Sequence, residues 1–227
     1  MGKAANAEPD ELDRLIRLYW APLRIFLVAT FPNLRNEADQ LVQEFAEERI
    51  LKKDWLRRAD PSRGRFRDFL KASLKNFVLD RLNRFEARHP PVPLSEVENE
   101  LLSAQNPSDA FDLQWVRTVL AQTLERMEAD CNDPAENQPR RGYIWQMFRL
   151  RLLEPALSDA QPVAYDELVQ RFELRSPTDA SNMLLSAKRI FKMHLNKVIE
   201  EYGERDAATL IEVNALAEFI QQLAKRC

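Results

Sequence analysis

A short basic segment is the part of this sequence whose residue types are best suited to chemistry. Residues 60–67 read DPSRGRFR, which places Arg63, Arg65 and Arg67 around a single glycine with Phe66 between two of the cations. Guanidinium groups bind phosphates, and aromatic rings stack on exposed bases. The segment therefore predicts a contact with single-stranded nucleic acid, although the helical spacing of Phe66 with later phenylalanines also suits a place in a core.

The charge of the chain is unevenly distributed around this segment. Residues 49–88 contain 13 Lys/Arg against 5 Asp/Glu, and residues 89–136 contain 2 against 10, in a chain of formal net charge −3. A basic band next to an acidic stretch favours an anionic partner for the band alone.

The composition argues against catalysis and against a bound metal. Neither Cys131 nor Cys227 lies in a pair spacing that suits zinc or thiol redox chemistry, and His89 and His194 are isolated. The sequence has no nucleophile–base set and no phosphate-binding glycine loop. No apolar run is long enough for a membrane span, and the N-terminus lacks an apolar signal core. We expect a cytoplasmic protein that is not an enzyme and has no cofactor or membrane insertion.

Helical periodicity and a content of only 4 Gly predict an all-α fold. Three helices, over about residues 10–30, 36–53 and 66–88, should form an N-terminal bundle within residues 1–89. The second should begin at the cap residue Asn36. It should bury Ala38, Leu41, Val42, Phe45, Ile50 and Leu51 and leave Asp39, Gln40, Gln43 and Glu44 outside.

A Pro-rich acidic linker over residues 90–107 separates this bundle from a second predicted domain over 108–203. The first helix of that domain should be capped by Ser108, with an apolar stripe of Leu113, Val116, Leu120, Leu124 and Met127. A following helix should end before Pro155. Residues 204–227 form a further predicted amphipathic helix.

A short helix at 163–172, a tight connection and a longer helix predict a helix-turn-helix within the second domain. Ser176 and Pro177 favour a helix start, and the Asp179 carboxylate should reach back to the cap. The predicted buried stripe is Ala180, Leu184, Ala187, Phe191, Leu195 and Val198. The face left for a DNA major groove carries Thr178, Ser181, Asn182, Leu185, Ser186 and Arg189.

Taken together, these segments resemble the small bacterial RNA polymerase sigma factors of the extracytoplasmic-function type. The resemblance rests on ADQLVQEF at 38–45, GRFRDFL at 64–70 and NFVLDRL at 76–82, followed by a second block from Tyr165 to Arg189. It implies a protein that binds core RNA polymerase and directs promoter recognition and strand opening.

The resemblance also implies a role for individual residues. Asp39, Gln40, Gln43 and Glu44 would bind polymerase. The minus-ten element would contact Arg63, Arg65, Phe66, Arg67, Asn76, Asp80, Arg81 and Arg84. The minus-thirty-five element would contact Thr178, Ser181, Asn182, Ser186, Lys188 and Arg189. The implied partners are core polymerase, promoter DNA and an anti-sigma factor or other regulator.

Two other functions stay open from the residues alone. One is a helix-turn-helix transcription regulator that acts without binding polymerase. The other is a helical interaction module that does not bind DNA. The sequence does not identify a promoter, an inducing signal, an oligomeric state or the role of residues 204–227.

Overall fold

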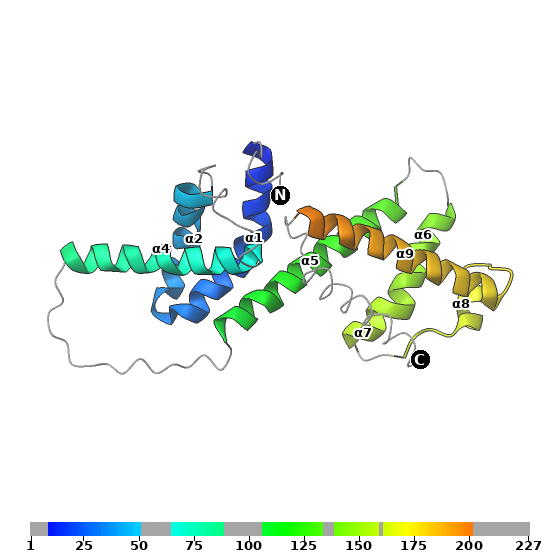
Figure 1. The fold of residues 1–227 in the computed structure, drawn as a ribbon. Helices are drawn as coiled ribbons and strands as arrows, with labels where there is room; N and C mark the ends of the chain where they lie inside the picture. The colour runs from blue at the N-terminus through cyan, green and yellow to red at the C-terminus, as the bar shows by residue number, and fades with distance from the viewer. Residues whose placement is uncertain (1–8, 51–64, 89–105, 134–138, 159–160, 202–227) are drawn as a thin grey trace. The chain divides into compact units, whose positions relative to one another are not determined.

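The computed structural model describes residues 9–50, 65–88, 106–133, 139–158 and 161–201 (Figure 1). Every regular element in these ranges is helical, which confirms the predicted all-α class. Within the same ranges, no helix is both long enough and apolar enough to cross a membrane. Arg63, nearly all of the predicted linker and the predicted C-terminal extension lie outside the described residues.

The chain divides into two compact units, and the division falls between Thr118 and Val119. The second unit was expected to begin at Ser108. Instead, the first turns of the helix that starts there belong to the first unit, for a reason that its aromatic contacts supply below.

In the described part of the first unit, α1 and α4 pack against a helical segment formed by α2 and η3. The π-helical segment η3 continues α2 without a break. The 3-10 helix η2 precedes α2, and Asn36 lies inside η2 rather than capping α2. The elements are α1 (Pro9–Thr30), η2 (Pro32–Glu37), α2 (Ala38–Phe45), η3 (Ala46–Ile50) and α4 (Phe66–Arg88).

The buried face of α2 and η3 follows the predicted stripe. Ala38, Leu41, Val42, Phe45 and Ile50 are all buried, while Leu51 lies outside the described residues. Across this contact Phe45 meets Phe77 of α4, with ring centroids 5.7 Å apart. The apolar stripe therefore fixes which polar residues of α2 face away from α1 and α4.

The first turns of α5 (Pro107–Cys131) complete the core of the first unit. Phe111 is fully buried and contacts two rings of α1, Tyr19 at 6.4 Å and Phe26 at 6.2 Å between centroids. Asn106, not Ser108, caps this helix, because its Oδ1 accepts a hydrogen bond from the Ser108 N–H at 3.0 Å.

The predicted apolar stripe of α5 was wrong except for Met127. Leu113 is 44% exposed, and Val116, Leu120 and Leu124 are only partly buried. The buried face instead carries Phe111, Trp115, Val119, Thr123, Met127 and Cys131. Aromatic side chains hide more apolar area than Leu or Val, so Phe111 and Trp115 set the orientation of the helix.

The second unit contains the rest of α5 and five further helical segments (Figure 1). In its core Phe148 lies between Trp145 and Phe191, with centroid distances of 6.1 Å and 5.1 Å. The segments are α6 (Pro139–Phe148), η6 (Arg149–Leu153), α7 (Glu154–Ser158), α8 (Tyr165–Arg171) and α9 (Pro177–Glu201).

The helix that contains Trp145 does not end before Pro155, contrary to the prediction. It widens into the π-helical segment η6 and continues as α7, with Pro155 in the first turn of α7. A proline inside a continuous helix cannot donate the usual backbone hydrogen bond, and the irregular segment η6 directly precedes it.

Helices α8 and α9 form the predicted pair of a short and a longer helix joined by a tight connection. The chain reverses at Glu173, whose φ of 50° is the positive value of a left-handed residue. Ser176 caps α9 as predicted, because its Oγ accepts a hydrogen bond from the Asp179 N–H at 3.2 Å. The predicted role of the Asp179 carboxylate was wrong, since it accepts from Arg175 Nε at 2.8 Å instead.

Polar contacts hold this helix pair on the rest of the second unit. Arg151 donates to the Val163 carbonyl at 2.7 Å, and its guanidinium lies 4.2 Å from the ring centroid of Tyr165 at the start of α8. At the other end of α9, Arg126 of α5 forms a two-point ion pair with Glu201, at 2.8 Å and 2.6 Å.

All six residues of the predicted α9 stripe are buried, together with Ile199 and His194. His194 Nε2 lies 3.2 Å from Asp130 Oδ2 of α5, and Arg141 reaches the same oxygen at 3.2 Å. The imidazole is thus part of the packing of α9 against α5 and α6.

Candidate nucleic-acid interface

The predicted polymerase-binding face of α2 lies on its solvent side. Asp39, Gln40 and Gln43 are exposed, and Glu44 is partly buried. Each takes part in an intramolecular contact: Asp39 accepts from Arg24 Nε at 2.9 Å, and Gln40 Nε2 donates to Glu44 Oε1 at 2.9 Å. Gln43 Nε2 likewise donates to Glu47 Oε1 at 2.9 Å, so the polar side chains of this face contact one another one turn apart.

This face is joined directly to the predicted DNA-binding helix. Glu44 forms an ion pair with Arg81 of α4, and Arg49 of η3 lies 3.9 Å from Asp80 of α4. The structure therefore places two sets of residues, predicted to meet different partners, on adjoining helices of one unit.

The middle of α4 presents a polar surface. Asn76, Asp80 and Arg84 are exposed, and Arg84 Nε donates to the Asp80 carbonyl at 3.1 Å. Successive members of this set are four residues apart, so they share one side of the helix. Arg81 lies at the edge of this side, half-buried against Glu44.

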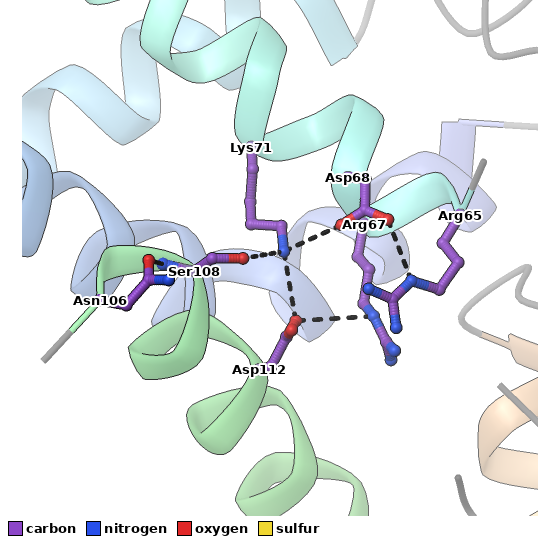
Figure 2. A network of polar contacts seen from close by, with 7 residues as sticks. All are labelled: Arg65, Arg67, Asp68, Lys71, Asn106, Ser108 and Asp112. Atoms are coloured by element: carbon purple, nitrogen blue, oxygen red, sulfur yellow. Dashed lines mark hydrogen bonds and ion pairs between the residues drawn. The ribbon is translucent and has the colours of Figure 1, made fainter. Parts of the chain in front are cut away.

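Arg65 and Arg67, the cations of the basic segment that the structure describes, lie in an ion cluster at the start of α4 (Figure 2). Arg65 Nε donates to Asp68 Oδ2 at 3.0 Å, and Lys71 Nζ lies 2.9 Å from Asp68 Oδ1. Burial alone would raise the pKa of Asp68, but the hydrogen bonds and charges of Arg65 and Lys71 outweigh it and lower that pKa below its ordinary value. Asp68 is held as a carboxylate between two cations.

Arg67 is the residue whose position differs most from its predicted role. Only 1% of its surface is exposed, its Nε lies 3.5 Å from Asp112 Oδ1, and its guanidinium lies 4.6 Å from the ring centroid of Trp115. In this arrangement Arg67 is a buried residue of the unit, and its side chain is not part of the surface that α4 presents to solvent.

Lys71 was not predicted as a functional residue, yet it joins the same cluster. It is 6% exposed, its Nζ donates to Ser108 Oγ at 2.7 Å, and the same atom lies 3.4 Å from Asp112 Oδ1. Its ammonium also lies 5.2 Å from the ring centroid of Phe111. Arg67 and Lys71 thus share one carboxylate, and each lies over an aromatic ring of α5.

The sequence gives a partial signal for this contact. Ser108, Asp112 and Trp115 recur at spacings of four and three, so they share a helical face, and that face combines anionic oxygen with a large ring. Such a face suits buried cations. Nothing local in the sequence indicates that the cations are those of residues 67 and 71.

Phe66 lies in an aromatic group at the start of α4. Its ring centroid is 5.7 Å from that of Tyr19, at an interplanar angle of 71°, and 6.2 Å from that of Phe69. Its side chain is partly buried. The ring thus packs on α1 while part of its surface still faces solvent.

The second unit carries the other predicted DNA surface, on α9. Thr178, Asn182 and Arg189 are exposed, while Ser181, Ser186 and Lys188 are partly buried. Ser186 Oγ donates to the Asn182 carbonyl at 3.1 Å, and Leu185 between them is 51% exposed. The face combines hydrogen-bonding groups, one exposed cation and one apolar side chain, which are the group types that read base edges in a major groove.

Comparisons with protein-family models, with curated proteins and with solved structures gave no match for this chain. The functional interpretation therefore rests on the residues and their geometry.

Proposed function

We propose that this chain is a sigma-type promoter-recognition factor, which binds RNA polymerase through the polar face of α2 and promoter DNA through α9 and the exposed side of α4. The observation that carries the proposal is the α8–α9 pair. A capped helix follows a short helix through a tight connection, and its exposed side presents Thr178, Asn182 and Arg189. This is the arrangement by which a recognition helix enters a major groove.

The polymerase part of the proposal is supported by the adjoining positions of α2 and α4. If α2 binds polymerase, the pair formed by Glu44 and Arg81 couples the position of α4 to that contact. Asn76, Asp80 and Arg84 would then face DNA held by the polymerase. Opening of the duplex costs on the order of 1.4 kcal/mol per base-pair step, and a stacked base returns about 1 to 3 kcal/mol. A short opening is therefore within reach of a few aromatic contacts.

In vitro transcription with purified core polymerase and a genomic template pool tests the function as a whole. We expect promoter-dependent transcripts that require this chain. Their absence, with a chain that is folded by circular dichroism, would contradict the proposal.

A test of the polymerase contact requires a substitution on α2 that leaves its ion pairs intact. Reversing the charge of Asp39 or Glu44 would also break its pair with Arg24 or Arg81. Gln43→Arg avoids both pairs, although it gives up one hydrogen bond to Glu47. We expect Gln43→Arg to weaken binding to core polymerase, whereas Gln170→Arg, the same substitution at an exposed site on α8, should bind core polymerase like the wild type.

The duplex contact is tested at Arg189. Removing one good side-chain contact to a base costs about 1 to 3 kcal/mol, so Arg189→Ala should weaken binding to a promoter duplex. Lys197→Ala is the matched control, because it removes the same charge at an exposed site about 12 Å further along α9. Equal losses at the two positions would indicate nonspecific attraction rather than a recognition face.

One observation favours a second function. Arg67 is buried and Phe66 packs on Tyr19, so the unit as folded presents fewer of the predicted strand-binding groups at its surface. A helix-turn-helix regulator that binds duplex DNA without opening it needs only α8 and α9. Duplex binding by the chain alone, together with no binding to core polymerase and no permanganate-reactive thymines in the bound DNA, would favour the regulator.

A further inference from the structure

We infer that the first turns of α5 are an autoinhibitory element, which withholds Arg67 and Lys71 from single-stranded DNA until the strand replaces Asp112 as their anion. The inference rests on the proposed function, because it assumes that the start of α4 lies near an opened strand. It adds Lys71 to the strand-binding residues, and it explains why the chain buries cations in a segment that otherwise suits nucleic acid.

The geometry of the cluster is that of an occupied anion site (Figure 2). Asp112 Oδ1 lies 3.5 Å from Arg67 Nε and 3.4 Å from Lys71 Nζ, and Ser108 Oγ accepts from Lys71 at 2.7 Å. Lys71 keeps a second anion on its own helix, because its Nζ also lies 2.9 Å from Asp68 Oδ1. On the α5 side, one carboxylate oxygen and one hydroxyl oxygen stand where two phosphate oxygens of a strand would make the same contacts.

The position of the cluster supports exchange between the two anions. Arg67 lies in the first turn of α4, where the positive end of the helix dipole disfavours a cation, and both Arg67 and Lys71 are buried, so each needs an anion close by. A buried charge left without its partner is strongly destabilising. The cluster should therefore stay closed around Asp112 and open only when another anion takes its place.

The aromatic contacts make the closed state the resting state. Phe111 and Trp115 are buried beside the same cations, so opening exposes apolar surface as well as charge. Because every strand that binds must first separate these contacts, the chain without polymerase should bind single strands weakly. A substitution that weakens the contact of α5 with Arg67 and Lys71 should therefore raise the affinity for single strands.

The test compares Asp112→Asn with Asp109→Asn in the full chain. Both remove one negative charge from the first turns of α5, but Asp109 is exposed, whereas Asp112 contacts Arg67 and Lys71. Binding is measured by fluorescence anisotropy of a labelled mixed-sequence single-stranded oligodeoxynucleotide over a series of salt concentrations. We expect about a tenfold gain in affinity for Asp112→Asn, the change that 1.4 kcal/mol represents, and less for Asp109→Asn.

The salt dependence distinguishes new phosphate contacts from a general change of charge. Each phosphate contacted in a single strand contributes about −0.7 to the slope of log affinity against log salt. Release of Arg67 and Lys71 should therefore steepen the slope by about 1.4. Adding Arg67→Gln to Asp112→Asn should remove about half of that steepening and most of the gain in affinity.

Three results would overturn the inference: equal gains for Asp112→Asn and Asp109→Asn, no gain for Asp112→Asn, or a gain that survives Arg67→Gln. If Asp112→Asn does not fold, hydrogen exchange of the wild type decides. Saturating oligodeoxynucleotide should then speed exchange of amides in residues 107–118, and unchanged or slower exchange would overturn the inference.

The outcomes separate this inference from the proposed function. Promoter-dependent transcription without a gain in strand binding for Asp112→Asn retains the function and removes the autoinhibitory contact. A gain in strand binding without promoter-dependent transcription retains the masked strand site and removes the sigma-type function.

Discussion

Arg81 of α4 forms an ion pair with Glu44 of α2, and this pair joins the two helical faces that the sequence assigned to different partners. Both side chains are partly exposed, so solvent screens the interaction. The pair therefore contributes modest stability and chiefly fixes the position of one helix on the other.

A double-mutant cycle measures this contribution. Glu44→Gln and Arg81→Gln, alone and together, should give a coupling free energy of about 0.5 to 1 kcal/mol by urea unfolding. Glu37→Gln replaces Glu44→Gln in the control cycle, because Glu37 is an exposed residue of η2 whereas Arg81 pairs with Glu44, and that coupling should be within about 0.3 kcal/mol of zero. Equal coupling in both cycles would contradict the pair.

The orientation of α5 predicts that truncation of Trp115 lowers the free energy of unfolding far more than truncation of Leu113, two residues away. Trp115 is 1% exposed and lies over Arg67, so Trp115→Ala should lower the free energy of unfolding by about 3 to 5 kcal/mol. Leu113 is 44% exposed, and Leu113→Ala should change it by no more than about 0.5 kcal/mol. Thermal or urea unfolding checks both values. A larger loss of stability for Leu113→Ala than for Trp115→Ala would instead support the apolar stripe of α5 that was expected from the sequence.

The start of α9 depends on one hydroxyl group. Ser176→Ala removes the acceptor for the Asp179 N–H and should destabilise the second unit by about 1 kcal/mol. Ser181→Ala, one turn later, makes the same substitution away from the cap. Hydrogen exchange of the buried amides of α9 over a urea series would report on this unit. Equal losses at the two serines would show that the cap contributes nothing specific.

The ion cluster predicts a pH dependence of stability. The pKa of Asp68 is lower in the folded chain than its ordinary value near 3.8, so its carboxylate stabilises the fold above about pH 4, and this contribution is lost as pH falls through the lowered pKa. Wild type should therefore lose stability in acid more steeply than Asp68→Asn. Unfolding midpoints over a pH series measure the difference, which should shrink in an Arg65→Gln background.

Local patterns predicted some elements well. The buried residues of α2 and the six-residue stripe of α9 agree with the structure, because each stripe consists of side chains of similar size at regular helical spacing. Ser176 and Pro177 marked the start of α9 because capping is decided within one turn. These features need no knowledge of distant residues.

The ion cluster could not be predicted from local patterns, because its members come from distant parts of the chain. Arg67 and Lys71 meet Asp112 across more than forty residues of chain, and a count of local charge treats all three as surface groups. The orientation of α5 was missed for a related reason. Counting apolar residues favoured the side with Leu113 and Leu120, while the larger rings of Phe111 and Trp115 decided the burial.

The connection between α8 and α9 contains one residue in the left-handed conformation, and this residue lies outside the face of α9 predicted to bind DNA. At Glu173 a side chain occupies a φ of 50°, a conformation that costs an L-residue roughly 1 kcal/mol and costs glycine nothing. Glu173→Gly should relax that bend, whereas Glu173→Val should strain it, and neither substitution touches Asn182 or Arg189. The stability of the turn between the two helices thus depends on one position, which is separate from the groups that α9 would offer to DNA.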